Sequence, residues 1–98
     1  MPIRPSTTFR VHIDTIKALV LANHALNPRV FGSVARGEDT VQSDLDLLVD
    51  TTAETTLFDI ARLKLQLKQL MGCEVDVLTP MAIAPAMRDN IHAQCIAL

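Results

Sequence analysis

The spacing of apolar residues along this chain predicts an alternation of helices and strands. The first apolar run has the three- and four-residue steps of a helix face and comprises Phe9, Ile13, Ile16 and Val20. Pro5-Ser6-Thr7-Thr8 offers N-cap candidates in front of this run. We therefore predict a first helix over residues 8–23.

Two short β-prone runs follow, separated by a polar segment. Asn27-Pro28 is a turn signal, and Arg29-Val30-Phe31 after it predicts a strand that stops at Gly32. The polar residues 33–43 contain one glycine and indicate a short helical turn followed by a loop. Residues 45–49 form the second predicted strand.

The longest amphipathic pattern lies at residues 57–71 and predicts a helix that Gly72 terminates. Its main apolar stripe comprises Ile60, Leu63, Leu67 and Leu70. A second stripe on the same helix comprises Phe58, Ala61 and Leu65. Together the stripes are wider than one core contact needs, so the second stripe either faces a partner or is buried on another side.

Residues 73–78 predict a third strand, in which apolar residues alternate with Glu74 and Asp76. The two acids therefore share one face of the strand. Pro80 ends this strand, and residues 82–96 supply a last helix. With 98 residues the chain is expected to form a single domain over its whole length.

Composition and charge narrow the functional classes. The chain is 49% hydrophobic and 20% charged, which is typical of a soluble globular protein. A net charge of -2 disfavours a protein that holds a long nucleic acid through its phosphates. The first ten residues lack the apolar core of a signal peptide, and no run approaches the roughly 20 apolar residues of a membrane span. Cys73 and Cys95 match no metal-ligand spacing. Two cysteines without a secretory signal fit a reducing compartment better than a disulfide-bonded scaffold, so a cytoplasmic protein is expected.

Candidate chemistry begins where the first strand ends. A strand that ends at Gly32 and enters a helical turn presents free backbone N–H groups at a positive helix end, which suits a phosphate. Gly32 has no Cβ and permits close approach, and Ser33 adds a hydroxyl donor. Arg36 could reach a phosphate oxygen from the same turn. Glu38 and Asp39 are expected to be ordinary loop charges.

Two aspartates at the start of the second strand indicate a metal site. Residues two apart on a strand point to one face with Cα atoms roughly 6.7 Å apart, so the carboxylates of Asp44 and Asp46 can converge. Their mutual repulsion is relieved by a divalent cation, and Mg²⁺ is usually held by carboxylates together with substrate phosphates. If the third strand lies beside the second, Asp76 joins them and two metals about 3.5–4 Å apart can bind. Asp76 would then also serve as the base.

Each acid alone has an ordinary alternative. Asp44 could cap a turn, and Asp46 could be an exposed strand residue. Asp76 could be solvated in the same way as Glu74 on a half-exposed sheet. The three acids together with Gly32-Ser33 favour the catalytic interpretation.

These residues carry a specific resemblance. Gly32-Ser33, ten residues, then Asp44-Leu45-Asp46 resembles the GS-x10-DxD signature of the DNA polymerase β-like nucleotidyltransferase superfamily, and Asp76 matches the third carboxylate of that family. The similarity covers nearly the whole chain. It is greatest to the minimal nucleotidyltransferases, or MNT proteins, which are commonly antitoxins paired with a HEPN-domain ribonuclease toxin.

The resemblance implies an α/β (α+β) fold with a small mixed β-sheet flanked by helices. It also implies two Mg²⁺ ions, ATP as donor, and transfer of AMP to a tyrosine hydroxyl of the HEPN toxin. By position it makes Ser33 a triphosphate ligand and makes Asp44, Asp46 and Asp76 the metal ligands. Because larger relatives use an additional domain to hold the acceptor, we expect a partner to bring it here.

Two other functions stay open. The chain could be an antitoxin that occludes its partner without catalysis, or an enzyme that nucleotidylates a small hydroxyl compound such as an aminoglycoside. The intact set of acids favours catalysis over binding alone, and the small size of the chain disfavours a small-molecule acceptor.

Overall fold

Four strands form one mixed sheet in the order β3-β2-β1-β4. The computed structural model describes residues 3–98. In chain order the elements are α1 (Pro5–Val11), α2 (Ile13–Ala22), β1 (Ala25–Phe31), α3 (Gly32–Arg36), β2 (Leu45–Thr51), α4 (Leu57–Met71), β3 (Val75–Leu78), the 3-10 helix η1 (Pro80–Ala82), α5 (Pro85–Gln94) and β4 (Ile96–Ala97). β1 is antiparallel to β2 and β4, whereas β3 is parallel to β2. The expected α+β fold with a mixed sheet is confirmed.

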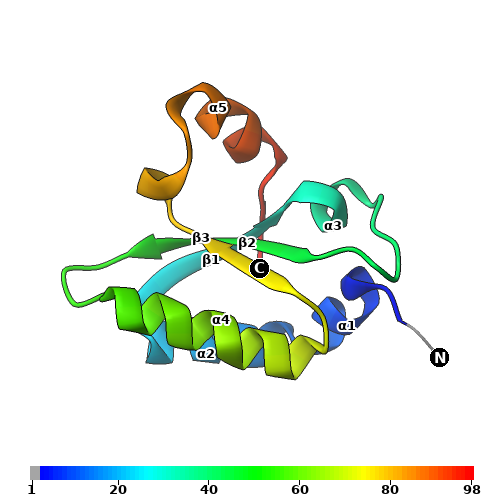
Figure 1. Cartoon of the computed structure of the whole chain (residues 1–98), viewed down its shortest axis with the longest axis horizontal. Coiled ribbons are helices and arrows are strands. Elements are labelled where there is room, and N and C mark those ends of the chain that lie inside the picture. The colour runs from blue at the N-terminus through cyan, green and yellow to red at the C-terminus, as the bar shows by residue number, and fades with distance from the viewer. Residues whose placement is uncertain (1–2) are drawn as a thin grey trace.

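The helices cover the two faces of the sheet unequally. Figure 1 shows α1, α2 and α4 on one side of the sheet and α3 and α5 on the other. Leu45, Leu47 and Val49 point from β2 into the larger core, which lies between the sheet and the first group of helices. Leu48 packs with Ile91 of α5 in a smaller second cluster. Because side chains alternate along a strand, Asp46 lies on the same face as Leu48, which we call the α3/α5 face.

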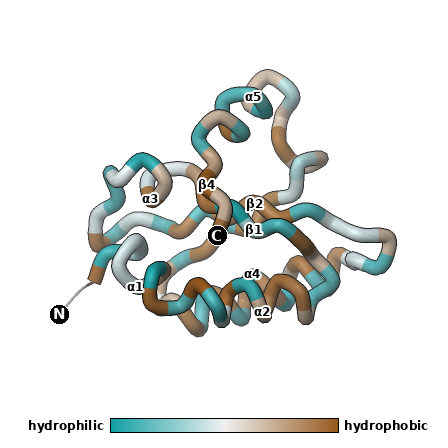
Figure 2. Tube along the Cα trace, turned by 180° about the vertical axis from the view of Figure 1, so that it is seen from behind, coloured by the Kyte–Doolittle hydropathy of each residue, from teal (hydrophilic) through white to brown (hydrophobic). Residues whose placement is uncertain are grey.

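Helix α4 is confirmed with the predicted bounds and with Gly72 at its C-terminal cap. Its hydrophilic and hydrophobic residues alternate along the tube in Figure 2. The second apolar stripe is not buried: Phe58 is 80% exposed and Leu65 is 57% exposed. The alternative of burial on a second side is therefore wrong. No helix within residues 3–98 has the length and apolar character that crossing a membrane requires.

The first predicted helix is two helices. α1 already begins at Pro5, and the backbone leaves helical geometry at His12 before α2 starts. Pro5 and Phe9 are buried, so α1 turns to place both side chains inside. No proline or glycine marks the break at His12, and the packing of these two side chains sets it.

The turn signal at Asn27-Pro28 lies inside a strand. β1 begins four residues earlier than predicted, and its pairing with β2 shifts between Leu26 and Arg29. Asn27 adopts a left-handed φ of 52°, and Pro28 has no N–H to donate to a ladder. The two residues therefore make a β-bulge rather than a turn.

The last predicted helix is shorter than expected. Thr79 precedes η1, and α5 starts only at Pro85, whose fixed φ suits the first position of a helix. Beyond α5 the chain forms β4, which pairs with Arg29 and Val30. A strand of two residues is too short to show an alternating pattern, so it could not be predicted from the sequence.

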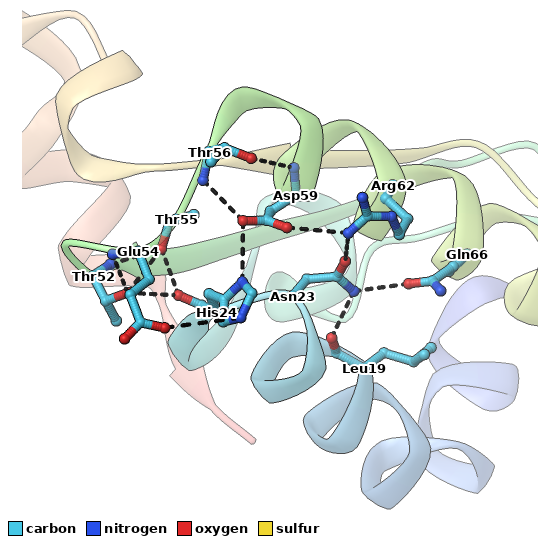
Figure 3. Close-up of polar contacts among 10 residues, drawn as sticks. All are labelled: Leu19, Asn23, His24, Thr52, Glu54, Thr55, Thr56, Asp59, Arg62 and Gln66. Atoms are coloured by element: carbon cyan, nitrogen blue, oxygen red, sulfur yellow. Dashed lines mark hydrogen bonds and ion pairs between the residues drawn. The ribbon is translucent and has the colours of Figure 1, made fainter.

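A polar network fixes the end of the sheet where β2 leads into α4 (Figure 3). Asp59 Oδ2 accepts a hydrogen bond from the Thr56 N–H at 2.9 Å and lies 3.2 Å from His24 Nδ1. Arg62 pairs with Asp59 Oδ1 at 3.1 Å. The backbone hydrogen bond from Thr56 is the largest of the interactions that lower the pKa of Asp59, which falls to about 2. Asp59 therefore joins the start of α4 to the end of α2.

We predict that this network makes stability sensitive to acid. The folded pKa of Asp59 is about 2 against an ordinary value of 3.8, so its contribution is present above pH 3.8 and is lost as the pH falls toward 2. Asp59→Asn should be less stable than the wild type at pH 7, and the difference should shrink below pH 4. Urea unfolding at both pH values measures this, and a difference independent of pH would contradict it.

Candidate active site

Asp46 occupies the centre of the α3/α5 face. Its Cα pairs with that of Phe31 on β1 and with that of Asp76 on β3. Gly32 follows Phe31 directly, so the predicted phosphate turn and the predicted third acid flank Asp46 on opposite sides. The condition that β3 lies beside β2 is met.

Gly32 lies in very close contact with the Asp46 carboxylate. Its φ is +72°, and a Cβ added there would be 2.2 Å from Asp46 Oδ2. A side chain there would require the Asp46 carboxylate to shift. Sequence reasoning assigned the missing Cβ to the approach of a phosphate, but the structure shows that it first makes room for Asp46.

The other two predicted nucleotide ligands belong to α3. No side chain within residues 3–98 caps the N-terminus of α3, so its first-turn N–H groups, next to the half-buried Ser33, have no side-chain acceptor. Arg36 lies at the opposite end, where its Nη1 donates to Gln94 Oε1 at 3.2 Å and its Nε is 3.4 Å from Glu38 Oε2. Gln94, which joins α3 to α5 through this hydrogen bond, was not predicted, because no local sequence pattern marks it.

The flanking acids are more exposed than Asp46. Asp44 lies one residue before β2, and the N–H of Leu45 donates to the Glu74 carbonyl at 3.0 Å. Asp76 is half-exposed, and its Oδ1 is 3.8 Å from Lys64 Nζ of α4. Within residues 3–98 no group of three or more His, Cys, Asp or Glu side chains is gathered closely enough to hold a metal ion as it stands. The three carboxylates are neighbours without converging on one point.

The electrostatics of Asp46 fit a cation. Burial raises the pKa of Asp46 to about 6, and the negative charges of Asp76 and Asp44 add to the increase, while Arg36 lowers it. An ionised carboxylate is therefore costly here at neutral pH unless positive charge approaches. Carboxylate oxygens are the ligands that Mg²⁺ prefers, so this set of residues fits that ion.

Asp39 is not an ordinary loop charge as predicted. It is only 4% exposed, and its Oδ2 accepts a hydrogen bond from the Ser6 N–H at 2.9 Å. Glu38 does remain exposed and is correctly predicted. Nothing in the local sequence identifies Asp39, because its partner is 33 residues away.

The exposed stripe of α4 lies away from this site. α4 covers the face of the sheet opposite to α3 and α5 (Figure 1). The Phe58 and Leu65 side chains of α4 are exposed. A cavity of about 640 Å³ beside the stripe is lined by Leu65, Lys68, Gln69, Gly72, Cys73 and Glu74. It includes none of the predicted site residues, so it is not the candidate active site.

Residues 20–98 match the nucleotidyltransferase domain family. A Methanocaldococcus jannaschii protein whose name assigns it to the protein adenylyltransferases is 41% identical over 78 residues, which cover 79% of this chain and 84% of that protein. A solved structure described as a minimal nucleotidyltransferase is 42% identical, with a TM-score of 0.86 and 95% coverage of both chains.

More distant structures share the fold. One is a toxin–antitoxin complex with AMP-PNP, at 19% identity and a TM-score of 0.73, covering 86% of this chain and 69% of that one. Another is an MNT antitoxin in complex with a tri-AMPylated HEPN toxin of Shewanella oneidensis. It is 16% identical with a TM-score of 0.68, covering 90% of this chain and 69% of that one.

We predict that the cost of a side chain at Gly32 depends on Asp46. Gly37 provides the matched control, since its φ is +71° but nothing lies within 4 Å of an added Cβ. Gly37→Ala should cost roughly 1–2 kcal/mol, the cost of a left-handed backbone for an L-residue. Gly32→Ala should cost more in the wild type, but only the same amount in an Asp46→Ala background. Denaturant unfolding of the wild type, Gly32→Ala, Asp46→Ala and the double variant measures the coupling free energy. Equal costs of Gly32→Ala in both backgrounds would contradict the predicted contact between Gly32 and Asp46.

We also predict that Asp46 destabilises the metal-free protein at neutral pH. Its folded pKa is about 6 against 3.8, so the cost is absent below pH 3.8 and grows as the pH rises through 6. Two pKa units correspond to about 3 kcal/mol, and solvent screening reduces this to about 1–2 kcal/mol. Asp46→Asn should therefore be more stable than the wild type at pH 8 in a chelator, and equally stable at pH 4.

Asp50 on the same strand is the control for this measurement. Hydrogen bonds from Asn27 and Arg29 hold the pKa of Asp50 below its ordinary value, so Asp50→Asn should lose stability at pH 8. An Asp46→Asn variant that is destabilised in the same way would contradict the assignment of electrostatic cost to Asp46.

Proposed function

This chain belongs to the nucleotidyltransferase domain family, and we propose that it transfers AMP from ATP to a tyrosine hydroxyl of a HEPN-domain toxin, for which it is the antitoxin. The observation that carries the proposal is the strand register that sets Asp46 between Gly32 and Asp76. That arrangement places a candidate phosphate turn beside a set of carboxylates. It supports phosphoryl chemistry more strongly than simple binding, because a binding surface gains nothing from a partly buried carboxylate with a raised pKa.

Each residue has a role in this proposal. The first-turn N–H groups of α3 and the Ser33 hydroxyl hold the triphosphate, and Arg36 turns from Gln94 toward a phosphate oxygen. Asp44, Asp46 and Asp76 hold Mg²⁺. When bound, Mg²⁺ supplies positive charge that offsets the triphosphate and the three carboxylates.

The transfer step balances without a further reactant. The acceptor oxygen forms a bond to the α-phosphorus of ATP, and the bond between that phosphorus and the bridging oxygen of pyrophosphate breaks. The acceptor loses its proton to the half-exposed Asp76, which lies on the open side of the site. The products are an AMP ester of the acceptor and pyrophosphate.

The acceptor is proposed to come from a partner. This chain contains no tyrosine, so a tyrosine acceptor has to belong to another protein. The similar folds found in complexes of MNT antitoxins with HEPN toxins support a partner of that class. Since Asp46 lies on the α3/α5 face, the acceptor has to approach the site from the side of α3 and α5. The exposed stripe of α4 lies on the opposite face of the sheet.

We predict that the chain labels a HEPN-domain partner protein when both are mixed with Mg²⁺ and ATP labelled at the α-phosphorus. Alone, it should show little turnover, because no acceptor is positioned. Asp44→Asn, Asp46→Asn and Asp76→Asn should each reduce labelling on the order of 100-fold or more, the scale on which one lost electrostatic group acts. Asp50→Asn lies on the same strand outside the site and should retain labelling.

Mass spectrometry of the labelled partner identifies the acceptor. An AMP-tyrosine peptide can come only from the partner. Binding without any label would support the non-catalytic antitoxin, and rapid transfer to a free aminoglycoside would support the small-molecule enzyme. Either result would contradict the proposed function.

A further inference from the structure

We propose that Asp39 is a positioning residue: its hydrogen bond to the backbone of Ser6 uses helix α1 to hold the loop that carries Asp44. The inference rests on the proposed function for its catalytic consequence, but its structural part can be tested separately. It concerns a residue of the ten-residue spacer, whose identity the family signature does not specify, and it assigns the N-terminal helix a role in the site.

The contact gives an acceptor to a helix N–H that has none within its own helix. The first N–H groups of a helix have no intrahelical acceptor. Arg4 stands at the N-cap of α1 and makes no side-chain capping bond. The Asp39 carboxylate takes that place from 33 residues away, accepting the Ser6 N–H at 2.9 Å. A carboxylate at a helix N-terminus is also stabilised by the helix dipole.

The carboxylate is held as an anion. Burial works to raise the pKa of Asp39, but hydrogen bonds from Ser6 and the positive charge of Arg4 outweigh burial and lower it. Within residues 3–98, Asp39 Oδ1 is buried and has no hydrogen-bond partner. An incompletely paired buried carboxylate is costly, so it is not a device that maximises stability alone.

Helix α1 is a firm anchor for this bond. Pro5 is fully buried directly beside Ser6, and Phe9 belongs to the main core cluster one turn further on. Both side chains fix α1 to the body of the protein. Movement of Asp39 would therefore have to displace either this packing or the hydrogen bond.

The loop has few other attachments. At the start of the loop, the Glu38 N–H donates a hydrogen bond to the Ser33 carbonyl. At its end, the Leu45 N–H donates to the Glu74 carbonyl. Between these points, Thr40 and Ser43 bond to each other within the loop. Within the described part of the chain, the hydrogen bond of Asp39 to Ser6 is the only one that joins residues 39–44 to another element.

The position of Asp44 therefore depends on this anchor. Asp44 is exposed and precedes the ladder of β2, so no strand pairing holds it. Without the hydrogen bond of Asp39, the connection between α3 and Leu45 is flexible. The Asp44 carboxylate then loses more conformational freedom when a cation binds. The expected consequence is weaker cation binding rather than a slower chemical step.

The first test is hydrogen exchange of the metal-free protein. The Ser43 N–H donates to the Thr40 carbonyl inside the loop. Asp39→Ala should increase the exchange rate of this amide by about tenfold, the factor that the loss of one net hydrogen bond represents. Asp39→Asn keeps an oxygen acceptor for the Ser6 N–H and should retain most of the protection. Gln42→Ala truncates an exposed side chain of the same loop, leaves the anchor intact and should not change the rates.

The second test is calorimetric titration of Mn²⁺ in the presence of a non-hydrolysable ATP analogue, which needs no turnover. Asp39→Ala should weaken Mn²⁺ affinity by about tenfold, with Asp39→Asn and Gln42→Ala near the wild type. In labelling assays the same variant should need about tenfold more Mg²⁺ for half-maximal rate while reaching a similar maximum.

The outcomes separate the two proposals. If the wild type transfers no AMP but the exchange and Mn²⁺ effects appear, the proposed function fails and the positioning role stands. If Asp39→Ala unfolds, Asp39→Asn, which keeps an acceptor for the Ser6 N–H, has to behave like the wild type in both tests for the proposal to survive. Unchanged exchange of the Ser43 amide, or unchanged Mn²⁺ affinity despite faster exchange, would overturn it.

Discussion

The contact between the backbone of Gly32 and the carboxylate of Asp46 is the constraint on which the α3/α5 face depends. It lets the first turn of α3 lie against an acidic side chain at the centre of the sheet, with no room for a Cβ between them. The fold bears a cost for this arrangement, because Asp46 is partly buried beside two other acids and its pKa rises to about 6. A cation and a triphosphate would together offset that cost. The cation would neutralise the three acids, and the triphosphate would accept hydrogen bonds from the N–H groups of α3.

The third acid reaches the site through strand register rather than through proximity in sequence. β3 is parallel to β2, so α4 has to return the chain to the same end of the sheet. Its length is set by the capping box of Thr56 and Asp59 at one end and by the left-handed Gly72 at the other. A slip of one residue between β2 and β3 would move Asp76 to the opposite face. The polar network around Asp59 therefore supports the site from a distance, because it fixes where α4 begins.

The sequence predicted the parts of this structure that local patterns determine. The bounds of α4, its glycine cap and the facing positions of Asp46 and Asp76 follow from periodicity and from residues whose conformational preferences are strong. The break at His12, the bulge at Asn27-Pro28 and the short β4 depend on packing between distant segments, so a local reading missed them. Asp39 is the clearest case, because its environment is created by a helix that lies 33 residues earlier.

The candidate site was predicted as a set of residues but not as a geometry. The conditional prediction that Asp76 lies beside Asp46 is met because β3 pairs with β2. Asp44, which was predicted to share the strand face of Asp46, lies just outside the strand. The role of Gly32 was assigned to phosphate alone, since a sequence cannot show that the neighbouring strand brings a carboxylate against it. The engagement of Arg36 with Gln94 and of Asp76 with Lys64 likewise joins elements that are far apart along the chain.

The central claim is that Asp46 and its neighbours bind a nucleoside triphosphate together with a divalent cation. Calorimetric titration of a non-hydrolysable ATP analogue, with Mg²⁺ and with a chelator, tests it most directly in the wild type, Asp46→Asn and Asp50→Asn. Binding of the analogue should require Mg²⁺, should be lost in Asp46→Asn and should persist in Asp50→Asn. Equal affinity of the wild type and Asp46→Asn for the analogue, with or without Mg²⁺, would contradict it.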